Sequence, residues 1–239
     1  MALLIEVVMP VFLVIGFGYL AVWRKYLGEV QLDGLMSFTM KFAIPCLLFN
    51  AMVGINLKAD FDLDLLASYY VSAAIVFLVG ILGGRYLFKR TLVDSVTIGF
   101  TCLFANSLLL GLAITERAFG ADALAANYVL ISVHAPFCYL IGITTMEIVR
   151  NNGKTGFDTF KRVLRAMFSN TLIVGIVTGL LYNLSGLPLP QPIEEAFGLM
   201  SRAALPIALF GLGGVLVQFR PEGDMRAIMF VIAVSLILH

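Results

Sequence analysis

Eight long apolar segments, separated by short polar loops, constrain this chain more than any other feature of its sequence. We place them at residues 3–23, 35–55, 66–88, 93–115, 125–149, 166–184, 197–217 and from 227 onward. A helix that crosses a bilayer needs about 20 mainly apolar residues. Hydrophobic residues make up 60% of the chain and charged residues 13%, whereas soluble domains carry about 25% charged residues. The sequence therefore predicts an all-α polytopic membrane protein.

The loops between these segments alternate in charge, which predicts an orientation in the membrane. Loops on one side hold most of the 16 Lys and Arg residues, namely Arg24, Lys25, Lys41, Arg85, Lys89, Arg90, Arg150, Lys154, Lys161, Arg162, Arg165, Arg220 and Arg226. The opposite side holds Lys58, Arg117 and Arg202, together with acidic residues such as Asp60 and Glu194. Because basic loops stay in the cytoplasm, we predict a multi-pass protein of the cell (inner) membrane with its N-terminus outside.

An apolar octapeptide with a central proline occurs twice. Phe42-Ala-Ile-Pro-Cys-Leu-Leu-Phe49 lies in the second segment and Ala203-Ala-Leu-Pro-Ile-Ala-Leu-Phe210 in the seventh, with four of eight positions identical. Proline within a helix removes a backbone donor and frees a carbonyl, which a bilayer tolerates only where protein or water satisfies that carbonyl. The pattern predicts helix breaks or hinges at Pro45 and Pro206, one in each half of a transporter built from internal repeats.

Five apolar segments precede a polar, basic loop, so a second set of five would enter the membrane from the opposite side. We divide the chain into a first five-span repeat (residues 1–149), a cytoplasmic basic linker (150–165) and an incomplete second repeat (166–239). The last segment is shorter than the roughly 20 residues that a spanning helix needs, and spans nine and ten are absent. We therefore expect a C-terminally truncated product or a fragment.

Motifs along the whole chain resemble the auxin efflux carrier family of membrane transporters, including its bacterial members. They are Pro10-Val-Phe-Leu-Val-Ile-Gly-Phe-Gly-Tyr-Leu20, the first proline octapeptide, Phe104-Ala-Asn-Ser-Leu-Leu-Leu-Gly-Leu-Ala113, His134-Ala-Pro-Phe and Leu205-Pro-Ile-Ala-Leu-Phe-Gly211. The resemblance implies ten spans in two inverted repeats, with a scaffold of spans one, two, six and seven and a mobile transport part formed by the others. It implies broken, crossing helices in spans four and nine. It also implies transport of small organic anions, namely auxin in plants and dicarboxylates such as malate or malonate in bacteria, and is compatible with a homodimer through the scaffold helices.

Span four departs from the bacterial pattern, in which an asparagine is followed by Gly-Leu-Pro. Here alanine stands at the proline position, as Ala113, which weakens the expectation of a sharp break. Gly111 can still supply flexibility, and Gly211 in span seven is a further candidate hinge.

Four polar residues within the spans are candidate substrate-binding residues. For Asn106 and Ser107 the prediction is a hydrogen-bonding site for a substrate carboxylate, because an amide donates two hydrogen bonds without the cost of burying a charge. The alternative is hydrogen bonding between helices. Asn50 either faces the substrate path or recaptures carbonyls freed by Pro45. His134 is either a proton relay or a structural residue.

Charged residues near the span ends receive a simpler interpretation. Glu116, Arg117 and Arg202 fall there, and we expect their side chains to be solvated at the membrane boundary. No pair of aspartates lies in the middle of a span, which argues against a sodium/proton antiporter.

Several functional classes are excluded by missing motifs. The chain has no His-Glu-x-x-His, no phosphate-binding loop, no Cys-x-x-Cys and no Gly-x-Ser-x-Gly, which are signatures of metalloproteases, nucleotide enzymes, redox proteins and hydrolases. We predict no metal, no cofactor and no enzymatic activity, and the net charge of +1 gives no reason to expect nucleic acid. The predicted function is transport of small organic anions, such as dicarboxylates or auxin-like acids, by alternating access. The alternatives are a sodium-coupled symporter resembling the bile acid transporters and a non-transporting, truncated remnant.

Overall fold

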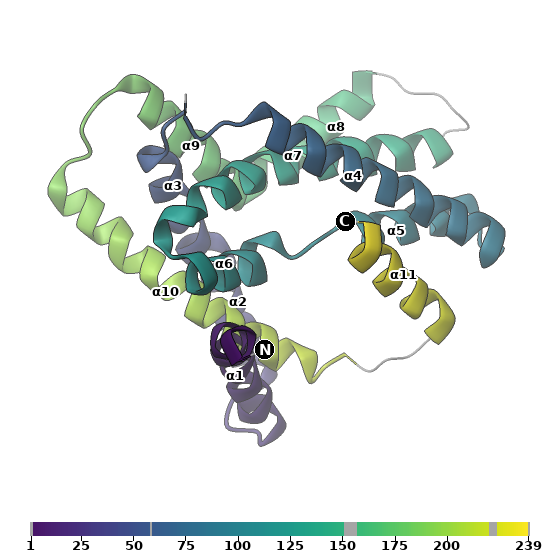
Figure 1. Cartoon of the computed structure of the whole chain (residues 1–239), viewed down its shortest axis with the longest axis horizontal. Helices are drawn as coiled ribbons and strands as arrows, with labels where there is room; N and C mark the ends of the chain where they lie inside the picture. Colours follow the sequence, from purple (N-terminus) through teal and green to yellow (C-terminus); the bar gives the residue numbers. More distant parts are fainter. Residues whose placement is uncertain (1, 58, 151–156, 220–223, 239) are drawn as a thin grey trace. The chain divides into compact units, whose positions relative to one another are not determined.

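A computed structural model describes residues 2–57, 59–150, 157–219 and 224–238. These residues form helices and no strand (Figure 1), as the apolar segments predicted. Lys58, Lys154 and Arg220, and with them residues 151–156 of the predicted linker, lie outside the described residues.

The helices follow one another along the whole described chain. They are α1 (Ala2–Trp23), α2 (Glu29–Phe38), the π-helical turn η1 (Thr39–Ala43), α3 (Ile44–Gly54), α4 (Leu63–Leu82), the π-helical turn η2 (Gly83–Leu87), α5 (Leu92–Leu103), the π-helical turn η3 (Ser107–Gly111), α6 (Leu112–Phe119), the 3₁₀ turn η4 (Ala121–Ala123), α7 (Leu124–Arg150), α8 (Phe157–Phe168), α9 (Thr171–Ser185), α10 (Gln191–Leu216) and α11 (Met225–Leu238).

Six helical segments of the described chain are long and apolar enough to cross a membrane. They are Ile5–Trp23, Glu29–Gly54, Leu63–Leu87, Leu92–Phe119, Ala121–Arg150 and Gln191–Leu216. A seventh candidate is the pair α8 and α9, whose axes are bent by 79°. With the shorter apolar helix α11, these elements correspond to the eight predicted segments, which confirms a polytopic α-helical membrane protein.

Short polar side chains begin several of these helices. Asp62 before α4, Thr91 before α5 and Asn170 before α9 each accept a hydrogen bond from a backbone N–H in the first turn. These N-caps satisfy donors that have no partner within the helix. Gly186, with φ of 66°, ends α9 in the left-handed conformation that favours glycine.

Spatial contacts divide the chain into two compact units. Unit 1 comprises Met1–Asp60, Asn106–Ser132 and Asn170–Arg220, and unit 2 comprises Phe61–Ala105, Val133–Ser169 and Pro221–His239. Spans one, two, six and seven, the scaffold implied by the family resemblance, lie in unit 1 together with the second half of span four and the first part of span five, up to Ser132. The predicted division into two successive repeats is a division of the sequence and not of spatial contacts, so it stays a prediction.

Within unit 1, α9 packs closely against α3 through two glycines. A Cβ added at Gly175 would lie 2.6 Å from the carbonyl oxygen of Pro45, and one at Gly179 would lie 2.6 Å from that of Phe49. Small residues spaced four apart allow such close approach of membrane helices. One turn further along the same face, the Asn183 amide donates to the three backbone carbonyls of Met52, Val53 and Ile55 at 3.0, 2.8 and 2.8 Å. It thereby satisfies acceptors that the end of α3 leaves without helical partners.

A reciprocal pair of glycines joins α1 to α10. A Cβ at Gly18 would overlap the backbone carbonyl of Phe210, and a Cβ at Gly213 would overlap that of Ile15. The two backbones therefore meet where each helix presents a glycine to a carbonyl of the other. This contact orients the second proline octapeptide, in α10, against α1.

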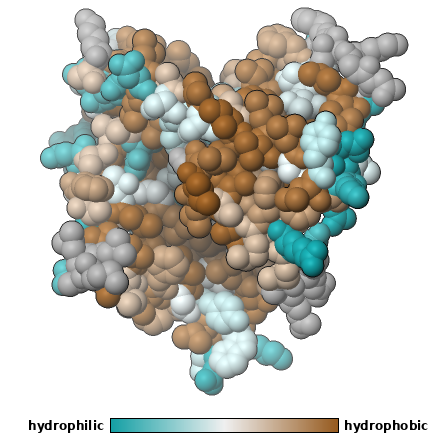
Figure 2. Space-filling view, turned by 45° about the vertical axis from the view of Figure 1, so that its right-hand side comes forward, coloured by the Kyte–Doolittle hydropathy of each residue, from teal (hydrophilic) through white to brown (hydrophobic). Residues whose placement is uncertain are grey.

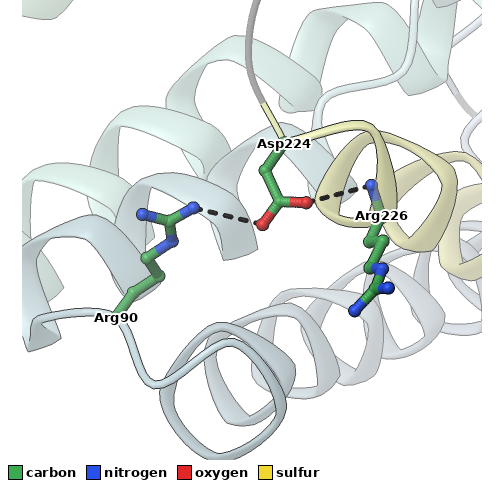
Figure 3. Close-up of polar contacts among 3 residues, drawn as sticks. All are labelled: Arg90, Asp224 and Arg226. Atoms are coloured by element: carbon green, nitrogen blue, oxygen red, sulfur yellow. Dashed lines mark hydrogen bonds and ion pairs between the residues drawn. The ribbon is translucent and has the colours of Figure 1, made fainter.

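Unit 2 is built on a similar close approach of α4 and α5. A Cβ at Gly80 would lie 2.6 Å from the Cα of Gly99, and the hydroxyl of Ser235 in α11 donates to the Cys102 carbonyl at 2.9 Å. Figure 3 shows how α11 begins: one carboxylate oxygen of Asp224 accepts from the Arg226 N–H at 3.1 Å, and the other lies 3.2 Å from Nη2 of Arg90. Asp224 thus caps α11 and pairs with the loop before α5.

The end of the predicted linker is helical. Residues 157–168 form α8, and Arg162 pairs with Glu147 of α7 through an Nη1–Oε1 distance of 2.6 Å. A break at Ser169 and Asn170 separates α8 from α9, so the apolar part of span six begins at Thr171, a few residues later than predicted.

Much of the molecular surface is apolar. Figure 2 shows that brown, hydrophobic side chains dominate the displayed face and that teal, hydrophilic side chains form separate clusters. Large exposed side chains include Phe12, Phe17, Leu78 and Leu181. Apolar surface of this extent is expected where a protein faces lipid.

Candidate functional site

Span four is interrupted in its middle. Helix α5 ends at Leu103, and the next helical turn, η3, begins at Ser107. Phe104 (φ −81°, ψ 91°) and Asn106 (φ −84°, ψ 59°) have non-helical dihedrals. The backbone therefore leaves the helix for three residues, although the proline of the bacterial pattern is absent.

Asn106 caps the helical segment that follows the break. Its Oδ1 accepts a hydrogen bond from the N–H of Leu109 at 3.2 Å, and its side chain is exposed. The Asn106 carbonyl accepts from the N–H of Gly111, also at 3.2 Å. Ser107 is the first residue of η3 and is half-buried. Asn106 and Ser107, predicted together as a binding pair, thus stand side by side at the break.

In span four, Gly111, the candidate hinge, and Ala113, which stands at the family's proline position, have different surroundings. A Cβ at Gly111 would meet its nearest neighbour, Cβ of Ser107, at 3.7 Å, which is an ordinary contact. Ala113 is buried in an apolar cluster with Val11, Ile15 and Leu209. The position where the family pattern has proline is therefore a packing contact in unit 1, and the hinge role of Gly111 stays a prediction.

The proline of the first octapeptide follows a π-helical turn. In η1 the N–H of Ile44 donates to the carbonyl of Thr39, five residues earlier. Pro45 has no N–H to continue that register, which leaves the Met40 carbonyl without a helical donor. The hydroxyl of Thr171 in α9 donates to this carbonyl at 2.9 Å. A side chain from another span thus satisfies the group that the proline frees.

Asn50 makes a different contact. Its amide donates to the hydroxyl of Ser201 in α10 at 3.3 Å, and Asn50 lines a cavity of about 600 Å³ with Gln191, Glu194, Glu195 and Arg202. Neither predicted role of Asn50 is decided by this contact, which connects spans two and seven.

The second octapeptide lies within the continuous helix α10. Pro206 lines a cavity described below. Gly211 is buried, and a Cβ there would overlap the sulfur of Met36 in α2. The Gly211 position therefore permits close packing, and its role as a hinge stays a prediction.

His134 lies in unit 2, whereas the other candidate binding residues, Asn50, Asn106 and Ser107, lie in unit 1. Its side chain is 8% exposed, and its Nε2 is 3.6 Å from Sγ of Cys138. Its ring has centroid distances of 5.7, 6.1 and 6.4 Å to the rings of Phe104, Tyr69 and Tyr70. The structure thus surrounds His134 with aromatic rings, and the proton-relay hypothesis stays a prediction.

A cavity of about 560 Å³ in unit 1 gathers charged residues from helices far apart in the sequence. Its polar lining is Glu116 and Arg117 of α6, Tyr128 of α7, and Ser201 and Arg202 of α10. Apolar side chains of α1, α3 and α10 complete it, among them Val11, Val14, Leu47, Leu205 and Leu209. The cavity combines two guanidinium groups and one carboxylate with mainly apolar walls.

A proline in α1 explains why Arg117 has a fixed position on this cavity. Pro10 cannot donate to the carbonyl of Glu6, four residues earlier. Arg117 supplies the donors: its Nη2 lies 3.2 Å from the Glu6 carbonyl oxygen and its Nε lies 3.0 Å from that of Val7. The guanidinium is thereby anchored to the break in the hydrogen bonding of α1.

Sequence reasoning assigned Glu116, Arg117 and Arg202 separately to solvated span ends and missed that they share a cavity. They meet because α6 and α10 both pack against α1, which are contacts between distant segments. The local signal is weak: Arg202 precedes Pro206 by four residues, which puts both on one face of α10. Among the described residues, no group of three or more His, Cys, Asp or Glu side chains is arranged to hold a metal ion.

Comparisons with known proteins all match this chain to membrane transport proteins. The model of a family described as "Membrane transport protein" matches residues 3–239. A protein of Rhizobium meliloti (strain 1021) named "Putative malonate transporter" is 24% identical over 245 residues, covering 100% of this chain and 75% of the relative. An "Uncharacterized transporter" of Methanothermobacter thermautotrophicus is 27% identical over 214 residues, covering 87% of this chain and 66% of the relative. The chain thus spans about two thirds to three quarters of these relatives.

Proposed function

This chain belongs to the membrane transport protein family, the auxin efflux carrier family that its motifs resemble, and we propose that it carries small organic anions across the cell membrane by alternating access. We take dicarboxylates as the leading substrate class and malonate as the probe, because a relative with 24% identity is named for malonate. The single observation that carries the site assignment is the interruption of span four at residues 104–106.

The interruption suits an anion for two physical reasons. The positive end of the helix dipole of the segment from Ser107 to Phe119 lies at the interruption. Asn106 uses its Oδ1 to accept from Leu109, so both N–H groups of its amide remain to donate to a carboxylate oxygen. Half-helix ends that point at substrate groups are a recurring feature of transporters.

A division of the chain falls at the same place. The boundary between units 2 and 1 lies between Ala105 and Asn106, so the exposed asparagine is the first residue on one side of it. Asn106 therefore belongs to the unit that holds the proline-containing spans, and movement of a transport part against those spans is part of the proposal.

The test is uptake of radiolabelled malonate into proteoliposomes that contain the purified protein. Asn106→Ala removes both the cap and the amide donors, and we expect uptake to fall at least tenfold, since a hydrogen bond to a charged group contributes about 1.5–3 kcal/mol. The matched control is Asn170→Ala, which removes the corresponding cap of α9, a 2.9 Å bond to the Leu172 N–H. Both variants lose about 1 kcal/mol of capping, so only the first should lose uptake.

A second variant separates capping from substrate binding. Asn106→Asp keeps an oxygen acceptor for the Leu109 N–H but replaces the amide donors by a negative charge. We expect a folded protein that does not take up malonate. Wild-type uptake in either Asn106 variant would refute the site assignment.

The same assay decides between the proposed function and its alternatives. Uptake that requires a sodium gradient would favour the sodium-coupled symporter, and uptake of auxin-like acids but not of malonate would change the substrate class. If the wild-type protein takes up no organic acid, the transport proposal is refuted. Labelling of a tag at the N-terminus from outside intact cells tests the orientation predicted from the loop charges.

A further inference from the structure

We propose that the cavity lined by Arg117 and Arg202 is a second carboxylate-binding site, a vestibule that collects the anion before it reaches the break in span four. This inference rests on the proposed transport of organic anions, and it concerns residues that the site at Asn106 does not use. The vestibule is defined by Glu116, Arg117, Tyr128, Ser201 and Arg202 and by the apolar side chains between them.

The charges of the vestibule favour an anion. Two guanidinium groups and one carboxylate line the vestibule, so these three side chains sum to a charge of +1, and Arg202 also lines the neighbouring cavity that holds Glu194 and Glu195. Guanidinium groups bind carboxylates through paired, charge-assisted hydrogen bonds. The hydroxyl of Tyr128 can donate a further hydrogen bond.

The size of the vestibule fits a small organic acid. Its volume of about 560 Å³ lies within the range of roughly 300–1,000 Å³ typical of small-molecule sites. A dicarboxylate of three or four carbons would fill part of it and could place its two carboxylates toward two different cations.

The two arginines are prepared for binding in different ways. Arg117 is held in place because its Nε and Nη2 donate to the Val7 and Glu6 carbonyls. A guanidinium has five N–H donors, so others remain for a ligand. The side chain of Arg202 forms neither a hydrogen bond nor an ion pair with any residue in the described part of the chain, and it is exposed. Arg202 is therefore available to close on a carboxylate that Arg117 orients.

The loop charges predict on which side of the membrane the vestibule lies. Arg117 and Arg202 belong to the few basic residues assigned to the outer side of the membrane. An anion arriving from outside would meet these two cations, whereas the basic loops near Arg24, Arg90 and Arg150 lie on the cytoplasmic side in this assignment. The vestibule would thus act at the external entrance or exit of the transport path.

Malonate binding to the 239-residue chain in lipid nanodiscs tests this inference, with titration calorimetry as the readout. We expect Arg202→Gln to raise the Kd about tenfold, because a charge-assisted hydrogen bond is removed. Glu116→Gln should lower the Kd about threefold, because a neighbouring negative charge is removed. Arg226→Gln is the matched control in unit 2 and should leave the Kd unchanged. Opposite shifts at positions 202 and 116 are a result that simple loss of structure cannot produce.

Two results of the binding experiment would overturn the proposed vestibule. A folded Arg202→Gln protein that binds malonate like the wild type, or a Glu116→Gln protein that binds it more weakly, overturns the vestibule. Should Arg202→Gln fail to fold, the alternative measurement is alkylation of Ser201→Cys by a negatively charged thiol reagent, with the unsubstituted chain as background. Malonate should slow that reaction, and equal rates with and without malonate overturn the vestibule. Failure of the wild type to take up any organic acid refutes the proposed function separately, because it is measured by uptake and not by these shifts.

Discussion

Replacing Gly18 by alanine tests whether α1 and α10 are in direct backbone contact. The carbonyl of Phe210 occupies the volume that a Cβ on Gly18 would fill, so the helices would have to separate by about 1 Å or more to reach an ordinary contact distance. Overpacking of this kind costs about 1–3 kcal/mol, and the better helix propensity of alanine offsets at most about 1 kcal/mol. We expect a net destabilisation of about 1–2 kcal/mol.

The same helix supplies a control two residues away. A Cβ added at Gly16 would have nothing within 4 Å, so Gly16→Ala should be neutral or stabilise the protein by up to about 1 kcal/mol. The assay is equilibrium unfolding in mixed micelles with increasing SDS, followed by circular dichroism. Equal effects of the two substitutions on the free energy of unfolding would refute the close contact of α1 and α10.

Two further predictions use the same unfolding assay. Asn183→Leu should cost about 1–2 kcal/mol, because it removes the amide that donates to three carbonyls at the end of α3; a change below 0.3 kcal/mol, on the order of measurement error, would contradict that role. Arg90→Gln should change stability by less than about 0.5 kcal/mol, because its ion pair is exposed, whereas Asp224→Ala should cost about 1 kcal/mol through the lost cap of α11. Equal losses in Arg90→Gln and Asp224→Ala would mean that the ion pair, and not the cap, holds α11.

The location of the spans could be predicted from the sequence because the bilayer acts on each segment separately. A segment of about 20 apolar residues must satisfy its backbone hydrogen bonds within itself, whatever its neighbours are. The apolar segments therefore predicted the helices with small shifts at their ends. Spans two and seven begin earlier than predicted, at Glu29 and Gln191, and the apolar part of span six begins later, at Thr171, after a break that Asn170 caps.

The break in span four could be predicted only in part. The family pattern indicated an interruption, but the replacement of the expected proline by Ala113 argued for a weaker one. The structure places the interruption at residues 104–106, before the position of that proline. It depends on a capping side chain, Asn106, and not on a missing donor, so the loss of proline does not abolish it.

The cluster of Arg117, Glu116 and Arg202 could not be predicted, since each residue alone has the sequence context of a solvated span end. Their common cavity arises from contacts of α6 and α10 with α1, between segments about 100 and 200 residues apart, and single-sequence reading does not resolve such contacts. Only the tertiary structure shows that Arg117 donates to carbonyls beside Pro10.

The sequence by itself determined the number and position of the apolar spans, the prolines within them, and the family. These properties follow from local composition, because lipid excludes unpaired backbone groups one segment at a time. The tertiary structure decided which side chains satisfy the carbonyls that the prolines free, where helices touch through glycine, and which charges share a cavity. Those features depend on the packing of helices distant in sequence, where a difference of one methyl group or one hydrogen bond selects the arrangement.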